Sequence, residues 1–210
     1  MSNLAATERA SLSDLLDRLG PFAPTLCEGW RTRDLTAHLV LREGRPDALA
    51  GIVVSALSGR TARVQRMLAH RNFSELVNRL RTGPPKWSPF RLPRIGEGTN
   101  NVEFFVHHED VRRAQPDWKP RVLDAATEEL LWLRCRRMAR LALRTQPGGI
   151  ELLRSDTGER HATRPPDAGR VVLTLSGTPQ ELLLYLFGRR DHALVEPDGD
   201  AETFRVLERS

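Results

Sequence analysis

Residues Asn101–Arg113, NVEFFVHHEDVRR, carry the strongest structural signal in the chain. The stretch holds no glycine or proline, and Pro116 follows it, so it predicts a helix from about residue 100 to residue 114. Glu103 and His107 are four residues apart, so on a helix both side chains project from the same face, about one turn apart. A carboxylate and an imidazole placed in this way can bind one divalent cation.

A third ligand is needed to complete such a site. Catalytic zinc typically takes three protein ligands and leaves one position open for water. His38 interrupts the apolar pattern of a helix predicted over residues 32–43, and there it points inward. Since metal sites in helical bundles are built from inward side chains on separate helices, His38, Glu103 and His107 are the predicted ligands. His108 points about 100° away from its neighbour and is not expected to bind the ion.

Most of the chain before residue 146 has the apolar spacing of amphipathic helices, with residues recurring every three to four positions. A proline-rich connector, residues 83–98, interrupts this pattern, because its prolines and glycines do not continue a helix. A loop of this length is often functional, and we expect it to cover the mouth of a site. The predicted helical stretches are residues 11–19, 32–43, 46–57, a further stretch ending near residue 81, then 100–114 and 125–145.

The pattern changes at Pro147-Gly148-Gly149. Beyond this point short apolar, β-branched runs predict strands, and Thr178-Pro179 marks the start of one more helix. We therefore expect an α+β protein with a helical metal-binding domain over residues 1–146 and a small α/β domain over residues 147–210. The elements predicted for the second domain are strands at residues 150–153, 171–175 and 193–195 and a helix at residues 179–187.

Composition narrows the class of protein. The 210 residues are 40% hydrophobic, which is enough for a core, yet no apolar run approaches the roughly 18 residues that span a bilayer. The first residues lack the charged start and apolar segment of a signal peptide, so we expect a cytoplasmic protein without a membrane partner.

The chain has two cysteines, which do not make a disulfide scaffold. Cys27 is interpreted as a plain buried thiol, with a role as metal ligand or as a neighbour of a ligand left open.

The net charge of +5 comes from an excess of arginine. Arg134, Arg137, Arg140 and Arg144 recur every three to four residues and line one face of a predicted helix. This face is either an anion-binding stripe or the solvated side of an amphipathic helix, and the second interpretation is the simpler one. We do not expect a nucleic-acid partner, because the chain has no recognisable motif and few aromatic residues for base stacking.

Three groups of residues together carry a family resemblance. The first is Gly29, Trp30, Asp34, Leu35, His38 and Leu39, the second is Glu103, His107 and Asp110, and the third is Leu186, Gly188 and Arg189. The combination resembles the mycothiol-dependent maleylpyruvate isomerase family of DinB/YfiT-like metalloenzymes, and within it a branch of small metal-binding proteins. The resemblance spans nearly the whole chain. It implies a DinB-like four-helix bundle followed by a small α/β domain, zinc held by His38, Glu103 and His107, and Arg189 as a catalytic arginine.

The resemblance also implies a chemistry. The open metal position would take a small thiol such as mycothiol as its thiolate, which would add to a small electrophilic substrate in an isomerase or S-transferase reaction. Arg189 or Arg190 could hold a substrate carboxylate, and Asp110 could orient a ligand from one turn beyond His107. The alternative is a non-catalytic, metal-containing regulatory or protein-binding module. A homodimer is left open.

Overall fold

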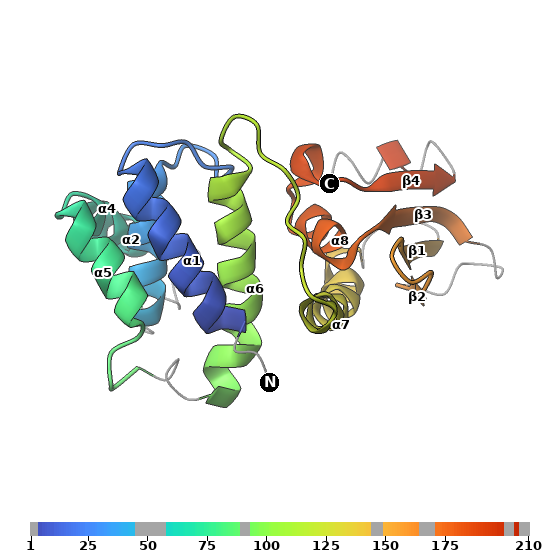
Figure 1. The fold of residues 1–210 in the computed structure, drawn as a ribbon, viewed down its shortest axis with the longest axis horizontal. Coiled ribbons are helices and arrows are strands. Elements are labelled where there is room, and N and C mark those ends of the chain that lie inside the picture. Colours follow the sequence, from blue (N-terminus) through green and yellow to red (C-terminus); the bar gives the residue numbers. More distant parts are fainter. Residues whose placement is uncertain are drawn as a thin grey trace. The chain divides into compact units, whose positions relative to one another are not determined.

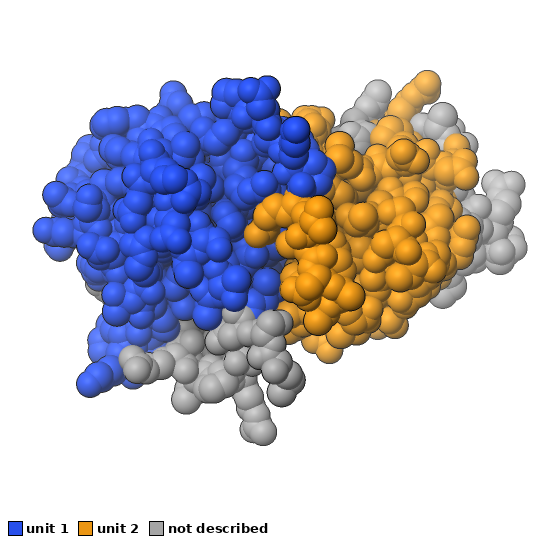
Figure 2. All heavy atoms as spheres, viewed as in Figure 1, with its two compact units in different colours: residues 1–120 blue, residues 121–210 orange. Residues whose placement is uncertain are grey.

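The computed structural model describes residues 4–44, 58–88, 93–143, 149–163, 171–199 and 204–205. The described residues form helices and a small four-stranded sheet, so the protein is of the mixed α+β class, as predicted (Figure 1). They divide into two compact units, residues 1–120 and residues 121–210 (Figure 2). The helical stretch predicted over residues 46–57 lies outside the described residues. No helix in the described segments has the length and apolar character needed to cross a membrane.

The first unit is helical. Its α1 packs against α6 and α5, and α2 packs against α4 and α5 (Figure 1). One apolar core joins α1, α2, α5 and α6, because leucines spaced at three and four residues on the first three helices meet Phe104 and Val111 of α6. The helices are α1 (Leu4–Leu19), α2 (Thr32–Gly44), α4 (Ser58–Ala69), α5 (Phe73–Thr82) and α6 (Pro93–Arg112).

Two of these helices begin earlier than the sequence predicted. α1 begins at Leu4 rather than near residue 11, and its first turns bury Leu4, Ala5 and Glu8. α6 begins at Pro93, so the connector predicted over residues 83–98 is shorter than expected. Proline suits the first turn of a helix because its missing N–H would have no partner there. A glycine inside a helix costs only about 1 kcal/mol, so the two glycines that follow do not end it.

The second unit is an α/β unit whose sheet has the strand order β2-β1-β3-β4. β1 and β3 pair in parallel, and the two outer strands pair antiparallel to them. Its elements are α7 (Ala125–Ala142), β1 (Gly149–Arg154), β2 (Arg160–Ala162), β3 (Val171–Gly177), α8 (Pro179–Leu186), the 3-10 helix η4 (Arg190–His192) and β4 (Glu196–Gly199).

The central strands and α8 lie where the sequence predicted them, whereas the edge strands do not. β2 was not predicted, and the last strand occupies residues 196–199 instead of 193–195. Both edge strands are short and polar, and every residue of β4 is exposed. They therefore lack the alternating apolar pattern from which strands are recognised.

The division between the units falls at Pro120 rather than at residue 146, where the sequence placed a domain boundary. The reason is the packing of α7, which lies against α8 within the second unit. Leu131 and Trp132 of α7 and Leu182 and Leu183 of α8 are fully buried. The composition change at Pro147-Gly148-Gly149 therefore marks the change from helix to strand inside one unit.

Candidate metal centre

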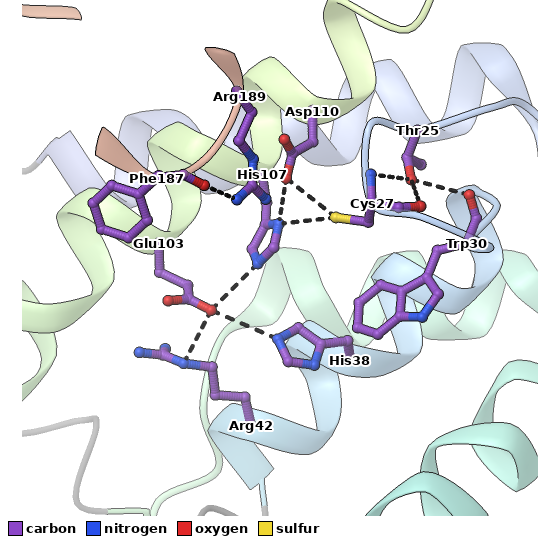
Figure 3. A network of polar contacts seen from close by, with 10 residues as sticks. All are labelled: Thr25, Cys27, Trp30, His38, Arg42, Glu103, His107, Asp110, Phe187 and Arg189. Carbon is purple, nitrogen blue, oxygen red and sulfur yellow. Dashed lines mark hydrogen bonds and ion pairs between the residues drawn. The ribbon is translucent and has the colours of Figure 1, made fainter. Parts of the chain in front are cut away.

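Two helices of the first unit bring the three predicted ligands together. His38 comes from α2, and Glu103 and His107 come from α6. Glu103 Oε1 lies 3.6 Å from His38 Nε2 and 3.3 Å from His107 Nε2. Figure 3 shows both histidines pointing toward this carboxylate oxygen. One donor atom from each residue lies within 4.8 Å of the other two. Zinc bonds of about 2.0–2.1 Å in a tetrahedron separate neighbouring ligand atoms by about 3.3 Å, so these distances suit a single ion.

The local sequence explains why these side chains meet. Leu35 and Leu39 flank His38 on α2 and lie in the common core, as does Phe104, the neighbour of Glu103. The imidazole of His38 packs between the ring of Trp30, with centroids 5.0 Å apart, and the ring of His107, with centroids 5.5 Å apart. The apolar packing of both helices therefore sets the separation of the polar groups that they carry.

Arg42 is a charged neighbour of the ligands that the sequence interpretation missed. It lies one turn beyond His38 on α2, it is buried, and its Nε is 3.4 Å from Glu103 Oε1. Burial alone would raise the pKa of Glu103, but its contacts with His107 and His38 and the charge of Arg42 hold that pKa well below the usual range. Glu103 is therefore ionised at neutral pH, the form that binds a cation. The four-residue spacing from His38 could have indicated Arg42.

Asp110 contacts the other edge of the His107 ring, where an orienting role was predicted for it. Its Oδ2 lies 2.9 Å from His107 Nδ1, and its side chain is 0% exposed. Burial by itself would lower the pKa of His107, but the contacts with Asp110, Cys27 and Glu103 outweigh it and raise that pKa well above the ordinary value. A ligating histidine commonly donates its second N–H to a carboxylate in this way.

Cys27 is half-buried and contacts this same pair of residues. Its Sγ lies 3.2 Å from Asp110 Oδ2 and 3.9 Å from His107 Nδ1 (Figure 3). Two hydrogen bonds hold the surrounding loop: Leu26 N donates to the backbone O of Asp110 at 3.0 Å, and Cys27 N donates to the side-chain Oγ1 of Thr25 at 3.2 Å. The thiol therefore has polar partners, unlike the plain buried thiol predicted. No spacing in the sequence links Cys27 to α6, which lies about eighty residues away.

The other residues singled out from the sequence have other partners or are exposed. His108 Nδ1 is 2.7 Å from Glu8 Oε2 of α1, and both side chains are buried, so this histidine is engaged with α1. Arg189 belongs to the second unit, where it precedes η4 and donates from Nη1 to Phe187 O at 2.5 Å. On α7, Arg137 and Arg140 are exposed and Arg134 is half-buried, while Arg144 lies outside the described residues.

The site combines imidazole and carboxylate donors, an ionised glutamate and a buried carboxylate behind one histidine. This donor set fits zinc and related divalent cations. The chain itself gives no match to a protein-family model, to a curated protein or to a solved structure.

Proposed function

We propose that this protein binds one divalent cation, zinc by the chemistry of the donors, through His38, Glu103 and His107. The observation that carries the proposal is the convergence of three donor atoms from two helices within 4.8 Å. The low pKa of Glu103 supports it, because the carboxylate needs no proton removed before it binds a cation. Three protein ligands would leave one position for an exogenous group, as in catalytic zinc sites.

The first unit is proposed to be a DinB-like four-helix bundle. The support is that four helices, α1, α2, α5 and α6, contribute side chains to one apolar core. Bundles of this kind place cofactor and metal ligands on facing helices, with their side chains projecting inward. His38 on α2 and Glu103 and His107 on α6 have this arrangement.

The chemistry we propose is that of a thiol-dependent isomerase or S-transferase acting on a small electrophilic substrate, with mycothiol as the expected thiol. A divalent cation at the site would hold the thiol as its thiolate, the nucleophilic form. Arg42 adds a positive charge beside Glu103, which favours an anionic exogenous group over a neutral one. Asp110 holds the His107 ring in one orientation, and Arg189 is the proposed partner of a substrate carboxylate.

Metal analysis of matched variants tests the ligand set. The Cys27→Ser background is used, because a thiol 3.9 Å from His107 Nδ1 could itself hold zinc. In this background we expect about one zinc per chain after dialysis, and its loss in His38→Ala and Glu103→Gln. His70→Ala, at an exposed histidine of the same unit, is the control and should retain the metal. Retention of zinc by His38→Ala in this background would show that the ligand set is wrong.

Binding of a thiol tests the catalytic part of the proposal. In a cobalt-substituted sample, mycothiol should bind and shift the visible spectrum, because the sulfur would enter the ligand field of the ion. A spectrum that stays unchanged at saturating thiol would favour the non-catalytic module instead.

A further inference from the structure

Nδ1 of His107, at the opposite edge of the ring from Nε2 and Glu103, faces a second set of donor atoms. We propose that Cys27, His107 and Asp110 form a second ligand set for a divalent cation, one that shares the His107 imidazole with the first set. The two sets lie at opposite edges of the ring (Figure 3). The inference goes beyond the proposed function, since the second set does not include His38 or Glu103 and can be occupied without them.

The distances among these three donors suit one ion. Sγ to Oδ2 is 3.2 Å, Nδ1 to Oδ2 is 2.9 Å and Sγ to Nδ1 is 3.9 Å. Bonds of about 2.3 Å to sulfur and about 2.0–2.1 Å to nitrogen and oxygen would separate tetrahedral ligand atoms by about 3.3–3.6 Å. Each distance is within about half an ångström of that range, so small side-chain rotations would close the site.

Sharing one imidazole makes the two sets mutually exclusive. A neutral imidazole has one acceptor nitrogen and one N–H, so it can ligate an ion on one side only. When Nε2 ligates, Nδ1–H can donate to Asp110 at 2.9 Å. When Nδ1 ligates, Nε2–H can donate to Glu103 at 3.3 Å. When the ion is at Nε2, Glu103 is a ligand and Asp110 accepts the hydrogen bond from the ligating histidine. When the ion is at Nδ1, the two carboxylates exchange these roles.

Charge and donor chemistry distinguish the two sets. With a thiolate and a carboxylate, the second set neutralises a dication completely, and the thiol proton leaves to solvent on binding. The first set supplies one negative charge and lies next to the Arg42 guanidinium. A thiolate ligand also binds soft, thiophilic metal ions more strongly than hard ones. We therefore expect Cd²⁺ and other thiophilic ions to select the second set, and the half-buried position of Cys27 gives them access.

Titration of the full chain with Cd²⁺ alone tests this inference through two matched variants. Glu103→Gln removes a ligand of the first set and leaves the second complete, whereas Cys27→Ser does the reverse. We expect Glu103→Gln to bind about one Cd²⁺ per chain with the ultraviolet sulfur-to-cadmium charge-transfer band, and Cys27→Ser to lack that band. Cys135 stays in both variants; it is fully buried and burial raises the pKa of its thiol to about 12, so it is not a competing donor.

A measurement on the unaltered chain keeps the inference testable if a variant does not fold. Cd²⁺ should slow the alkylation of Cys27, followed by mass spectrometry, by about tenfold or more, because a ligated sulfur no longer attacks. Alkylation at the same rate with and without Cd²⁺, or a folded Glu103→Gln chain without the sulfur band, would overturn the second set. Two ions bound at once by the unaltered chain would overturn the exclusivity. Neither outcome bears on zinc binding in the Cys27→Ser background, so the two proposals fail separately.

Discussion

The imidazole Nδ1 of His107 lies 2.9 Å from Oδ2 of Asp110, and this carboxylate is completely shielded from solvent. A carboxylate that water does not reach interacts electrostatically mainly with the few groups that it contacts. Among those groups are the His107 ring and the Cys27 thiol. The contact orients the ring so that Nε2 faces Glu103 Oε1, 3.3 Å away.

In the Cys27→Ser background, which lacks the second ligand set, Asp110→Asn should weaken zinc binding by about ten- to a hundredfold, the usual effect of removing the hydrogen-bond partner of a ligating histidine. The amide has the size of the carboxylate but no charge, so it holds the ring less firmly. A competition titration against a chromophoric chelator measures the affinity. Asp14→Asn in the same background, at an exposed carboxylate of the same unit paired with Arg81, is the control and should bind zinc as the Cys27→Ser chain does. Equal affinities for the two variants would contradict an orienting role for Asp110.

Zinc affinity should rise with pH. The raised pKa of His107 means that its ring holds a proton at neutral pH in the metal-free protein, and this proton must leave before the ring can bind an ion. Below that pKa, in the Cys27→Ser background, we expect the apparent affinity to rise by about tenfold per pH unit, since about one proton is released for each ion bound. Isothermal titration in buffers of different ionisation enthalpy counts the protons released. An affinity that does not change with pH would show that His107 is not a ligand.

A fragment of residues 121–210 should fold, and a fragment of residues 147–210 should not. The shorter fragment lacks α7, and the fully buried Leu182 and Leu183 of α8 would lose the helix against which they pack. Exposing a buried leucine costs about 1.5–3 kcal/mol, a large part of the stability of a small domain. Circular dichroism during heating distinguishes a cooperative transition from its absence. Cooperative unfolding of both fragments would instead support the boundary near residue 146.

His161 of β2 should make the second unit less stable in mild acid. Burial, and then the charges of Arg136 and Arg140, lower the pKa of His161. Because the folded-state pKa lies below the unfolded one, the contribution of His161 to stability is complete above about pH 6.5 and is lost as the pH falls toward the folded pKa. Arg140→Gln should raise the pKa of His161, as followed by NMR. Arg137→Gln, at an exposed arginine of α7 that is not a cause of the shift, is the control; equal pKa values in the two variants would contradict the attribution.

The sequence predicted those features that depend on local periodicity. The α+β class, α2, α7, α8 and the central strands were recognisable because apolar residues repeat with the period of each element. His38, Glu103 and His107 were recognisable because each is a polar residue on an apolar helix face, and the structure brings them together. The edge strands and the first turns of α6 were not predicted, since short polar strands and glycines in a helix carry no such periodicity.

Spacing along one helix placed Glu103 and His107 on a common face, and nothing more than the geometry of a helix was needed for that. The position of Cys27 beside His107, and the packing of α7 on α8 in the second unit, depend on contacts between segments far apart in the chain. Such contacts are set by how side chains fill a shared core, and core packing has no counterpart in the spacing of residues along a single element. Glu103 at Nε2 and Asp110 at Nδ1 of the His107 ring were therefore visible in the sequence, because both lie on the same helix as His107. The contact of Cys27 with Nδ1 came only from folding the loop before α2 against α6.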